Sequence, residues 1–329
     1  MPHLTSRVLF ASIPVLIALC MPASTGKLIA AGTNRQAGYG GVSFSYDPAL
    51  AGGAKGRIVP EQKEGPNTAL WQVHPQHIRF DFGSGPRDEA DLLAPSVYVF
   101  PTNADYKGLV PDPQDEIWLP RIDRLKTVLS SYPDLSGVGS DVSNSGVKGE
   151  DLPYLPPVNA ASQYIWKQRY LAFKSGSGVR YVTRFSQDAS WVTREGTVYT
   201  FQGLTSDRKY YVSVVFPTFL TPAAGLAPPG QNQDPGAYNP GAVSTLNSAD
   251  DPLYNPSLAA LDEMVQSVVI GSNTTLGQKG GQTGNSNSTF PGMPRTGGQA
   301  GVADGWGLLL GAVLLATGLV CKKRGAYPT

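Results

Sequence analysis

This chain has few cysteines and few histidines, and its positive and negative charges nearly balance. Its 329 residues include 2 Cys and 3 His, and 26 Lys plus Arg stand against 25 Asp plus Glu, which gives a formal net charge of +1. The basic residues form no stripe, so the composition excludes the electrostatic surface typical of nucleic-acid-binding proteins. The 38 Gly and 28 Pro predict long loops around one domain.

The N-terminus has the layout of a secretory signal peptide. Arg7 precedes an apolar stretch over residues 8–19, and small residues follow it. We therefore expect residues 1–26 to be removed on export, with cleavage after Cys20, Ala23 or Gly26. Cys20 also suggests a lipoprotein, although Leu19 stands where a small residue is usual. The other cysteine is Cys321, so a chain that loses both ends has neither a disulfide nor a thiol nucleophile.

Three elements follow one another at the C-terminal end. A five-residue motif comes first, then an apolar run over 306–321, then a basic tail; the motif is Met293, Pro294, Arg295, Thr296 and Gly297, and the tail is Lys322, Lys323 and Arg324. As a helix the run of about 16 residues rises roughly 24 Å, against about 30 Å for a hydrocarbon core. The tail favours the cytoplasmic side, which leaves the preceding chain outside. The run therefore predicts a transient membrane contact.

Together these elements resemble the sorting signal of sortase-anchored surface proteins, usually written Leu-Pro-x-Thr-Gly. The resemblance implies that a sortase cysteine attacks the Thr296 carbonyl, that the bond to Gly297 breaks, and that the acyl group passes to an amine of the peptidoglycan precursor. Met293 stands where Leu is usual, and the two side chains have similar volumes. The alternative is a plain C-terminal membrane anchor, and both interpretations place the domain at the cell surface.

Upstream of the motif, residues 271–292 are mostly Gly, Ser, Asn and Thr and predict a flexible tether. Residues 39–270 are expected to form an extracellular α+β domain, in which helices pack on a mainly antiparallel sheet and Pro- and Gly-rich loops are long. Alternating apolar residues predict strands at 42–47, 77–82 and 96–100. Two hairpins are expected, 170–173 with 179–185 around a turn at 175–178, and 198–204 with 210–216 around a turn at 205–209.

Two amphipathic helices are expected to cover this sheet. The segment 121–132 places Ile122, Leu125, Val128, Leu129 and Tyr132 on one face. The segment 255–270 has Asn255 as a cap and Pro256 at its first position, followed by the stripe Leu258, Leu261, Val265 and Val268. Residues 217–251 are expected to form a long surface excursion. This order of elements resembles the α+β sandwich of Mog1 and PsbP-like domains.

Few side chains suggest catalysis or metal binding, and no cofactor is expected. His74 and His77 precede a strand, where a structural or solvent-facing role is favoured over metal binding. Ser145 and Lys148 fit a nucleophile pattern only formally, because they lie in a polar loop. The same loop resembles a calcium loop at Asp141, Ser143, Ser145 and Gly146, but Leu152 stands where a carboxylate is needed. Asp112, Asp115 and Glu116 are expected to form a solvated turn.

Two classes of function remain open. A non-enzymatic surface module, structural or binding a glycan or peptide, is favoured because no set of nucleophile, base and metal is recognisable. Aromatic residues that stack on sugars are the remaining indication of such binding, with at least half expected in the core; they are Trp71, Trp118, Trp166 and Trp191. The alternative is an anchored hydrolase that uses carboxylates such as Asp81, Asp188 and Glu195, which depends on the distance between paired acids.

Overall fold

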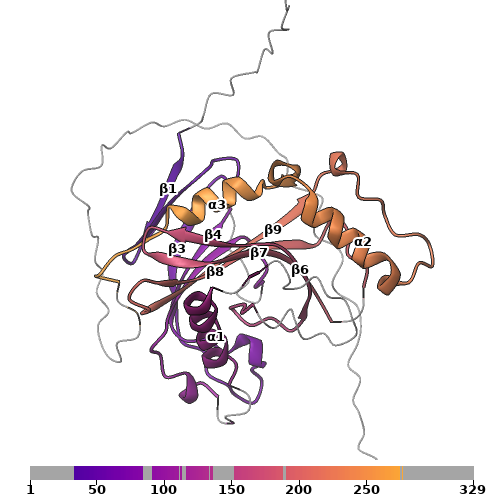
Figure 1. Ribbon diagram of the computed structural model, residues 1–329. Helices are drawn as coiled ribbons and strands as arrows, with labels where there is room; N and C mark the ends of the chain where they lie inside the picture. Colours follow the sequence, from indigo (N-terminus) through magenta and orange to yellow (C-terminus); the bar gives the residue numbers. More distant parts are fainter. Residues whose placement is uncertain are drawn as a thin grey trace, which may run out of the picture. The chain divides into compact units, whose positions relative to one another are not determined.

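Two antiparallel sheets form the framework of the chain in a computed structural model (Figure 1). The structure describes residues 33–83, 91–110, 112, 116–132, 134–135, 152–187, 190–274 and 276. All of them belong to one compact unit that spans Met1–Lys279. The fold is α+β with antiparallel pairing throughout its ladders, which confirms the predicted class.

The larger sheet has eight strands. Its order is β3 (Ala54–Val59), β4 (His77–Phe82), β5 (Ser96–Pro101), β9 (Tyr210–Leu220), β8 (Thr197–Thr205), β7 (Gly176–Ser186) and β6 (Ala161–Phe173), while β10 (Tyr254–Asn255) pairs with the end of β9. The smaller sheet has the order β1 (Arg35–Tyr39), β2 (Val42–Tyr46) and β11 (Val269–Ile270). Among the described residues, the last strand along the chain thus pairs with one of the first.

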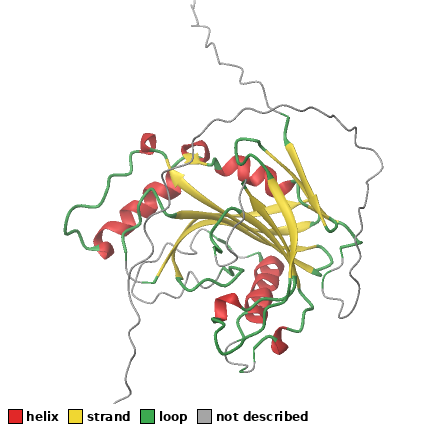
Figure 2. Cartoon of the chain, turned by 180° about the vertical axis from the view of Figure 1, so that it is seen from behind, coloured by secondary structure: helices red, strands yellow, loops and turns green. Residues whose placement is uncertain are grey.

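Both faces of the larger sheet are buried. Along β9, Val212, Val214 and Phe216 face one apolar core, whereas Tyr211 and Val215 face another. The first, which we call the α3-side core, also takes in α2 (Pro235–Ser248), α3 (Leu258–Gln266) and the smaller sheet. The second, the α1-side core, takes in α1 (Trp118–Ser131). Figure 2 shows the same arrangement from behind, with helices on either side of the strands.

The predicted strands and hairpins are confirmed, with longer strands and one displaced turn. The three single strands appear as β2, β4 and β5, and the hairpins as β6–β7 and β8–β9. Gly176 and Gly178 lie inside β7 and pair with Thr205 and Gly203, so the first turn is shorter than expected. A Cβ atom at Gly178 would come within 2.3 Å of the Gln202 carbonyl oxygen. These glycines therefore permit a close approach of neighbouring strands and do not form the turn.

Both predicted helices are present, with corrected ends. Tyr132 follows α1 with φ 44° and is 56% exposed, so it is not part of the buried stripe. Asn255 does not cap α3, because its backbone pairs with Phe219 in the sheet. The Ser257 hydroxyl caps α3 and accepts a hydrogen bond from the Ala260 amide at 3.1 Å. Val268 lies beyond the helix yet is fully buried.

The expected surface excursion at 217–251 contains regular structure, which corrects that prediction. β9 continues to Leu220, and α2 follows later in the same segment. Asp234 caps α2 by accepting from the Ala237 amide at 3.0 Å, and Pro235 occupies the first turn. The helix buries Ala242, Val243 and Leu246, so it belongs to the α3-side core.

Candidate functional site

A buried pair of opposite charges lies between the larger sheet and α3. Arg180 alternates along β7 with Val179 and Tyr181 of the α1-side core, so its side chain lies on the opposite face, toward α3. There its Nε and Nη2 donate to the Asp262 carboxylate at 3.2 and 3.0 Å. The side chains are only 2% and 3% exposed. Burying two charges is costly, so their pairing must be nearly complete for the site to be stable.

Further donors complete the surroundings of Asp262. The Tyr199 hydroxyl donates to its Oδ1 at 2.8 Å, and Arg169 donates to its Oδ2. Burial, followed by the nearby Asp262 charge, raises the pKa of Tyr199 well above its ordinary value. Tyr199 therefore stays protonated at neutral pH and acts as a donor. Both carboxylate oxygens are thus occupied by donors of the protein itself.

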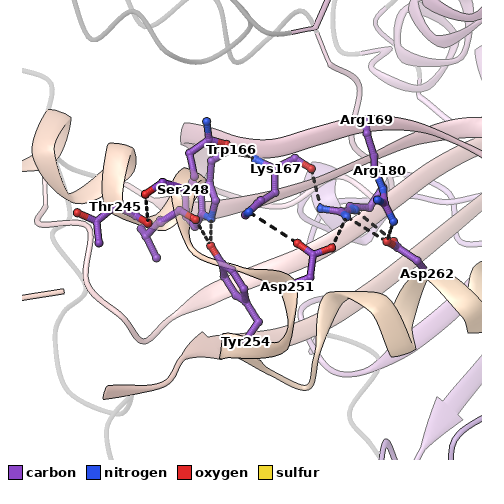
Figure 3. A network of polar contacts seen from close by, with 11 residues as sticks. Trp166, Lys167, Arg169, Arg180, Thr245, Ser248, Asp251, Tyr254 and Asp262 are labelled. Carbon is purple, nitrogen blue, oxygen red and sulfur yellow. Dashed lines mark hydrogen bonds and ion pairs between the residues drawn. The ribbon is translucent and has the colours of Figure 1, made fainter. Parts of the chain in front are cut away.

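A bulge in β6 brings the remaining members of the cluster together (Figure 3). Lys167 has φ 57°, and its carbonyl oxygen accepts from Arg180 Nη1 at 2.8 Å. Its amide donates to the Asn247 side chain of α2 at 2.9 Å. Asp251, which begins the short 3-10 helix η6 (Asp251–Leu253), lies 3.2 Å from Arg180 Nη2 and 3.7 Å from Lys167 Nζ.

Next to this cluster, Trp166 and Tyr254 extend the polar contacts. The indole Nε1 of Trp166 donates to the Tyr254 hydroxyl at 3.0 Å, and that hydroxyl donates to the Leu246 carbonyl at 2.5 Å. The whole set joins β6 and β7 to α2, η6 and α3. This arrangement can fix the helices on the sheet; it presents no pair of open carboxylates to a substrate.

The carboxylates proposed for hydrolysis do not form a pair in the part that the structure describes. Asp81 on β4 is held by Arg57 at 3.1 Å and Arg79 at 2.6 Å. Glu195 is exposed in the connection between β7 and β8, and Asp188 lies outside the described residues. The described positions therefore give no support to a two-carboxylate mechanism built on these residues.

The two histidines contact each other, with ring centroids 4.8 Å apart. Their Nδ1 atoms lie 3.2 Å (His74) and 2.8 Å (His77) from the Pro75 carbonyl oxygen, to which protonated Nδ1 atoms donate. His77 is buried and packs against Phe100 at 4.7 Å. Burial, followed by the charge of His74, holds the pKa of His77 well below its ordinary value. Within the described ranges no group of three His, Cys, Asp or Glu residues could hold a metal ion.

The four tryptophans considered for sugar binding are divided between core and surface. Trp118 donates to the Val73 carbonyl at 3.0 Å and Trp166 is part of the α3-side core, so both are buried. Trp71 and Trp191 are 36% and 38% exposed. Their neighbours Leu70 and Val192 pack in different cores, on opposite faces of the larger sheet. The exposed tryptophans therefore do not form one aromatic platform.

Some of the remaining candidate residues lie outside the part of the chain that the structure describes. Glu116 was expected in a solvated turn, but its side chain also has a structural role. Its Oε1 accepts hydrogen bonds from the Trp118 and Leu119 amides at 2.7 and 2.9 Å and so caps α1. Asp112 is exposed, and Leu152 is buried against the α1-side core. Outside the described residues lie Asp115, Asp141, Ser143, Ser145, Gly146 and Lys148, the sorting motif Met293 to Gly297, and the tail Lys322, Lys323 and Arg324.

A row of polar side chains crosses the α1-side face of the larger sheet, and the sequence analysis missed it. Neighbouring strands place Arg79, Tyr98, Ser213 and Gln202 opposite one another in succession. All four are buried. The Gln202 side chain accepts from the Leu155 amide at 3.0 Å, and Ser213 donates to the Leu155 carbonyl at 2.5 Å. Polar residues inside otherwise apolar strands are the signal that marks this row in the sequence.

Among the described residues, no helix is long and apolar enough to cross a membrane. The apolar run at 306–321 lies outside them. Comparison with protein-family models, with curated proteins and with solved structures found no significant match to this chain. The resemblances to sortase-anchored proteins and to Mog1 and PsbP-like domains therefore stay predictions.

Proposed function

We propose that this chain is an exported surface protein that a sortase joins covalently to the cell wall. On this proposal the α+β unit is displayed outside the cell as a non-enzymatic module that has a structural role or binds an envelope component. Thr296 becomes the new C-terminus, and the peptidoglycan precursor supplies the accepting amine. The apolar run and the basic tail retain the chain at the membrane until that transfer.

The order and spacing of the C-terminal elements carry this proposal. Leu276, the last described residue, is buried at 7% exposure and belongs to the α3-side core. Residues 277–292 then precede Met293 and are mostly Gly, Ser, Asn and Thr. Sixteen such residues reach roughly 55 Å when extended. That length is enough to present the motif to an enzyme without opening the fold.

A binding or structural role agrees better with the charged groups than hydrolysis does. A carboxylate-based hydrolase needs two acids that face each other across a cleft. Asp81, Asp251 and Asp262 are instead bound to arginine side chains. Asp251 and Asp262, engaged in this way, hold the helices on the sheet, and Asp81 joins β4 to β3.

Replacing Thr296 with Ala tests the attachment. We expect Thr296→Ala to move the protein from the wall fraction to the membrane or the medium, because the scissile residue of the motif is lost. Thr289→Ala, in the preceding tether, is the matched control and should leave the protein in the wall fraction. Covalent attachment of Thr296→Ala to purified wall at the normal level would contradict the proposal.

A further inference from the structure

Trp191 lies on the surface, where the connection between β7 and β8 meets the segment that leads to α2. Its side chain is 38% exposed, and its indole Nε1 donates to the Gln233 carbonyl at 2.8 Å. Gln233 belongs to residues 221–234, which precede α2 and run beside it at the right of Figure 1. We call these residues the α2 loop. The hydrogen bond restricts the rotation of an aromatic ring that solvent can reach.

One buried residue of α2 holds the backbone on both sides of Trp191. The Asn239 side chain is 1% exposed, and its Oδ1 accepts from the Val192 amide at 2.8 Å. Its Nδ2 donates to the Ser190 carbonyl at 3.0 Å. Such bonds are costly to break, because the buried groups would be left without partners. The fold therefore positions both the backbone and the ring of Trp191, which lowers the entropy cost of stacking a ligand on it.

The α2 loop is also fixed to the rest of the fold. The Tyr238 hydroxyl of α2 donates to the Ala227 carbonyl at 2.7 Å. Within the loop, the Gly230 amide donates to Gln233 Oε1 at 2.9 Å. Leu226 packs against the α3-side core. The loop thus presents a defined surface next to the indole.

The α2 loop and α2 carry almost no charge. Over residues 221–249 the single charged side chain is that of Asp234, which caps α2. Uncharged amide side chains are exposed there instead, at Gln231, Asn232 and Gln233. An amide group both donates and accepts hydrogen bonds, as do the hydroxyl and acetamido groups of a sugar. An anionic ligand would favour Lys or Arg, and this stretch contains neither.

The exposed indole adds the second part of a sugar-binding surface. The face of an aromatic ring carries partial negative charge, so it attracts the C–H groups on one side of a sugar ring. An aromatic face for stacking and uncharged amides for hydrogen bonding together suit a neutral glycan. Trp191 and the α2 loop are joined by the bond to Gln233, so both parts lie at one place on the surface.

We infer that Trp191 and the α2 loop bind a neutral, N-acetylated glycan strand of the wall, with a sugar ring on the indole face. The source of the glycan rests on the function proposed above, in which Thr296 is joined to the wall. The chain from Leu276 to Thr296 then reaches roughly 70 Å when extended, which keeps the folded unit close to wall glycans.

Titration of the purified chain with a tetramer of β-1,4-linked N-acetylglucosamine tests this inference, with NMR and calorimetry as readouts. The indole N–H signal of Trp191 should shift as the glycan is added. Trp191→Ala should weaken binding roughly tenfold, the factor expected when one important contact is lost. Trp191→Phe keeps an aromatic ring and should bind more tightly than Trp191→Ala. Both variants should melt close to the unchanged chain, since the lost bond to Gln233 is exposed and water can replace it.

A second tryptophan and a second probe provide the controls. Trp71 is 36% exposed, and its neighbour Leu70 packs against the α1-side core, so Trp71→Ala should leave binding unchanged. A polyproline peptide is the competing probe, because aromatic surfaces also bind extended proline-rich chains. Absence of glycan binding, equal binding by Trp191→Ala, or binding of the peptide in place of the glycan would overturn the inference. Wall attachment is measured separately with Thr296→Ala, so such a result leaves the sorting proposal intact.

Discussion

Replacement of Asp262 with Asn tests whether the buried charge cluster holds the helices on the sheet. The substitution keeps the size of the side chain and removes its charge. It leaves Arg180 charged at 2% exposure and turns an amide N–H₂ group toward donors of Arg180, Arg169 or Tyr199. Donors that face donors in a buried site repel each other and lose their hydrogen bonds.

The expected cost follows from the geometry of the cluster. Removing one partner of a buried ion pair destabilises a protein by about 3 to 5 kcal/mol. Asp251 remains 3.2 Å from Arg180 Nη2 and still compensates part of the arginine charge. We therefore expect Asp262→Asn to lower the stability by about 3 kcal/mol. At roughly 2 to 4 °C per kcal/mol for a domain of this size, the melting temperature should fall by about 6 to 12 °C.

Urea unfolding followed by circular dichroism measures this difference. Asp251→Asn is the matched control, because it removes the same charge from the same arginine at a side chain that is 25% exposed. Its expected cost is about 1 kcal/mol, since partly solvated ion pairs contribute little. The double replacement Arg180→Met with Asp262→Leu removes both buried charges and should recover part of the stability. The buried Tyr199 hydroxyl loses its acceptor, which limits the recovery. Equal costs for the two single Asp variants would refute the assignment of Asp262 as the central member.

The remaining predictions concern pH and the C-terminal helix. Because the pKa of His77 is depressed in the fold, the unfolded chain binds more protons below about pH 6.5, so stability should fall as pH drops from there toward the folded pKa. Unfolding of His77→Gln should lack this part of the pH dependence; a dependence as steep as that of the unchanged chain would contradict the assignment. A chain that ends at Asn255 loses the buried side chains of Leu258, Leu261, Met264 and Val265. At about 2 kcal/mol each, this loss equals the stability of a typical domain, so that chain should aggregate, whereas one that ends at Thr296 should melt normally by scanning calorimetry. Similar melting of the two chains would show that α3 contributes little.

Local patterns predicted the elements whose residues are close in sequence. Apolar residues at the spacing of a strand predicted β4, β5, β8 and β9, and apolar residues at the spacing of a helix predicted α3. α2 was missed because Pro235, Gly236, Pro240 and Gly241 disfavour a helical interpretation. Asp234 followed by Pro235 is a capping signal that would have indicated its start.

The charge cluster was beyond prediction for a different reason. Arg180 and Asp262 are 82 positions apart. Arg180 lies between Val179 and Tyr181 on β7, and Asp262 lies between Leu261 and Glu263 on α3. No local spacing relates a strand residue to a later helix residue, so their contact depends on the complete topology. The second apolar face of the sheet was equally hidden, since a continuous apolar strand does not reveal how many layers cover it.

The polar row on the α1-side face has a consequence for the accuracy of folding. When both faces of a sheet are apolar, a strand that pairs one residue out of place exchanges one apolar face for another and meets little resistance. Here such a slip of β8 would move Gln202 into the α3-side core and Phe201 toward Leu155. Gln202 would then lose its partners in a dry environment, which costs more than an apolar exchange. The buried polar groups thus disfavour shifted strand pairings, because only the observed register leaves them with hydrogen-bond partners.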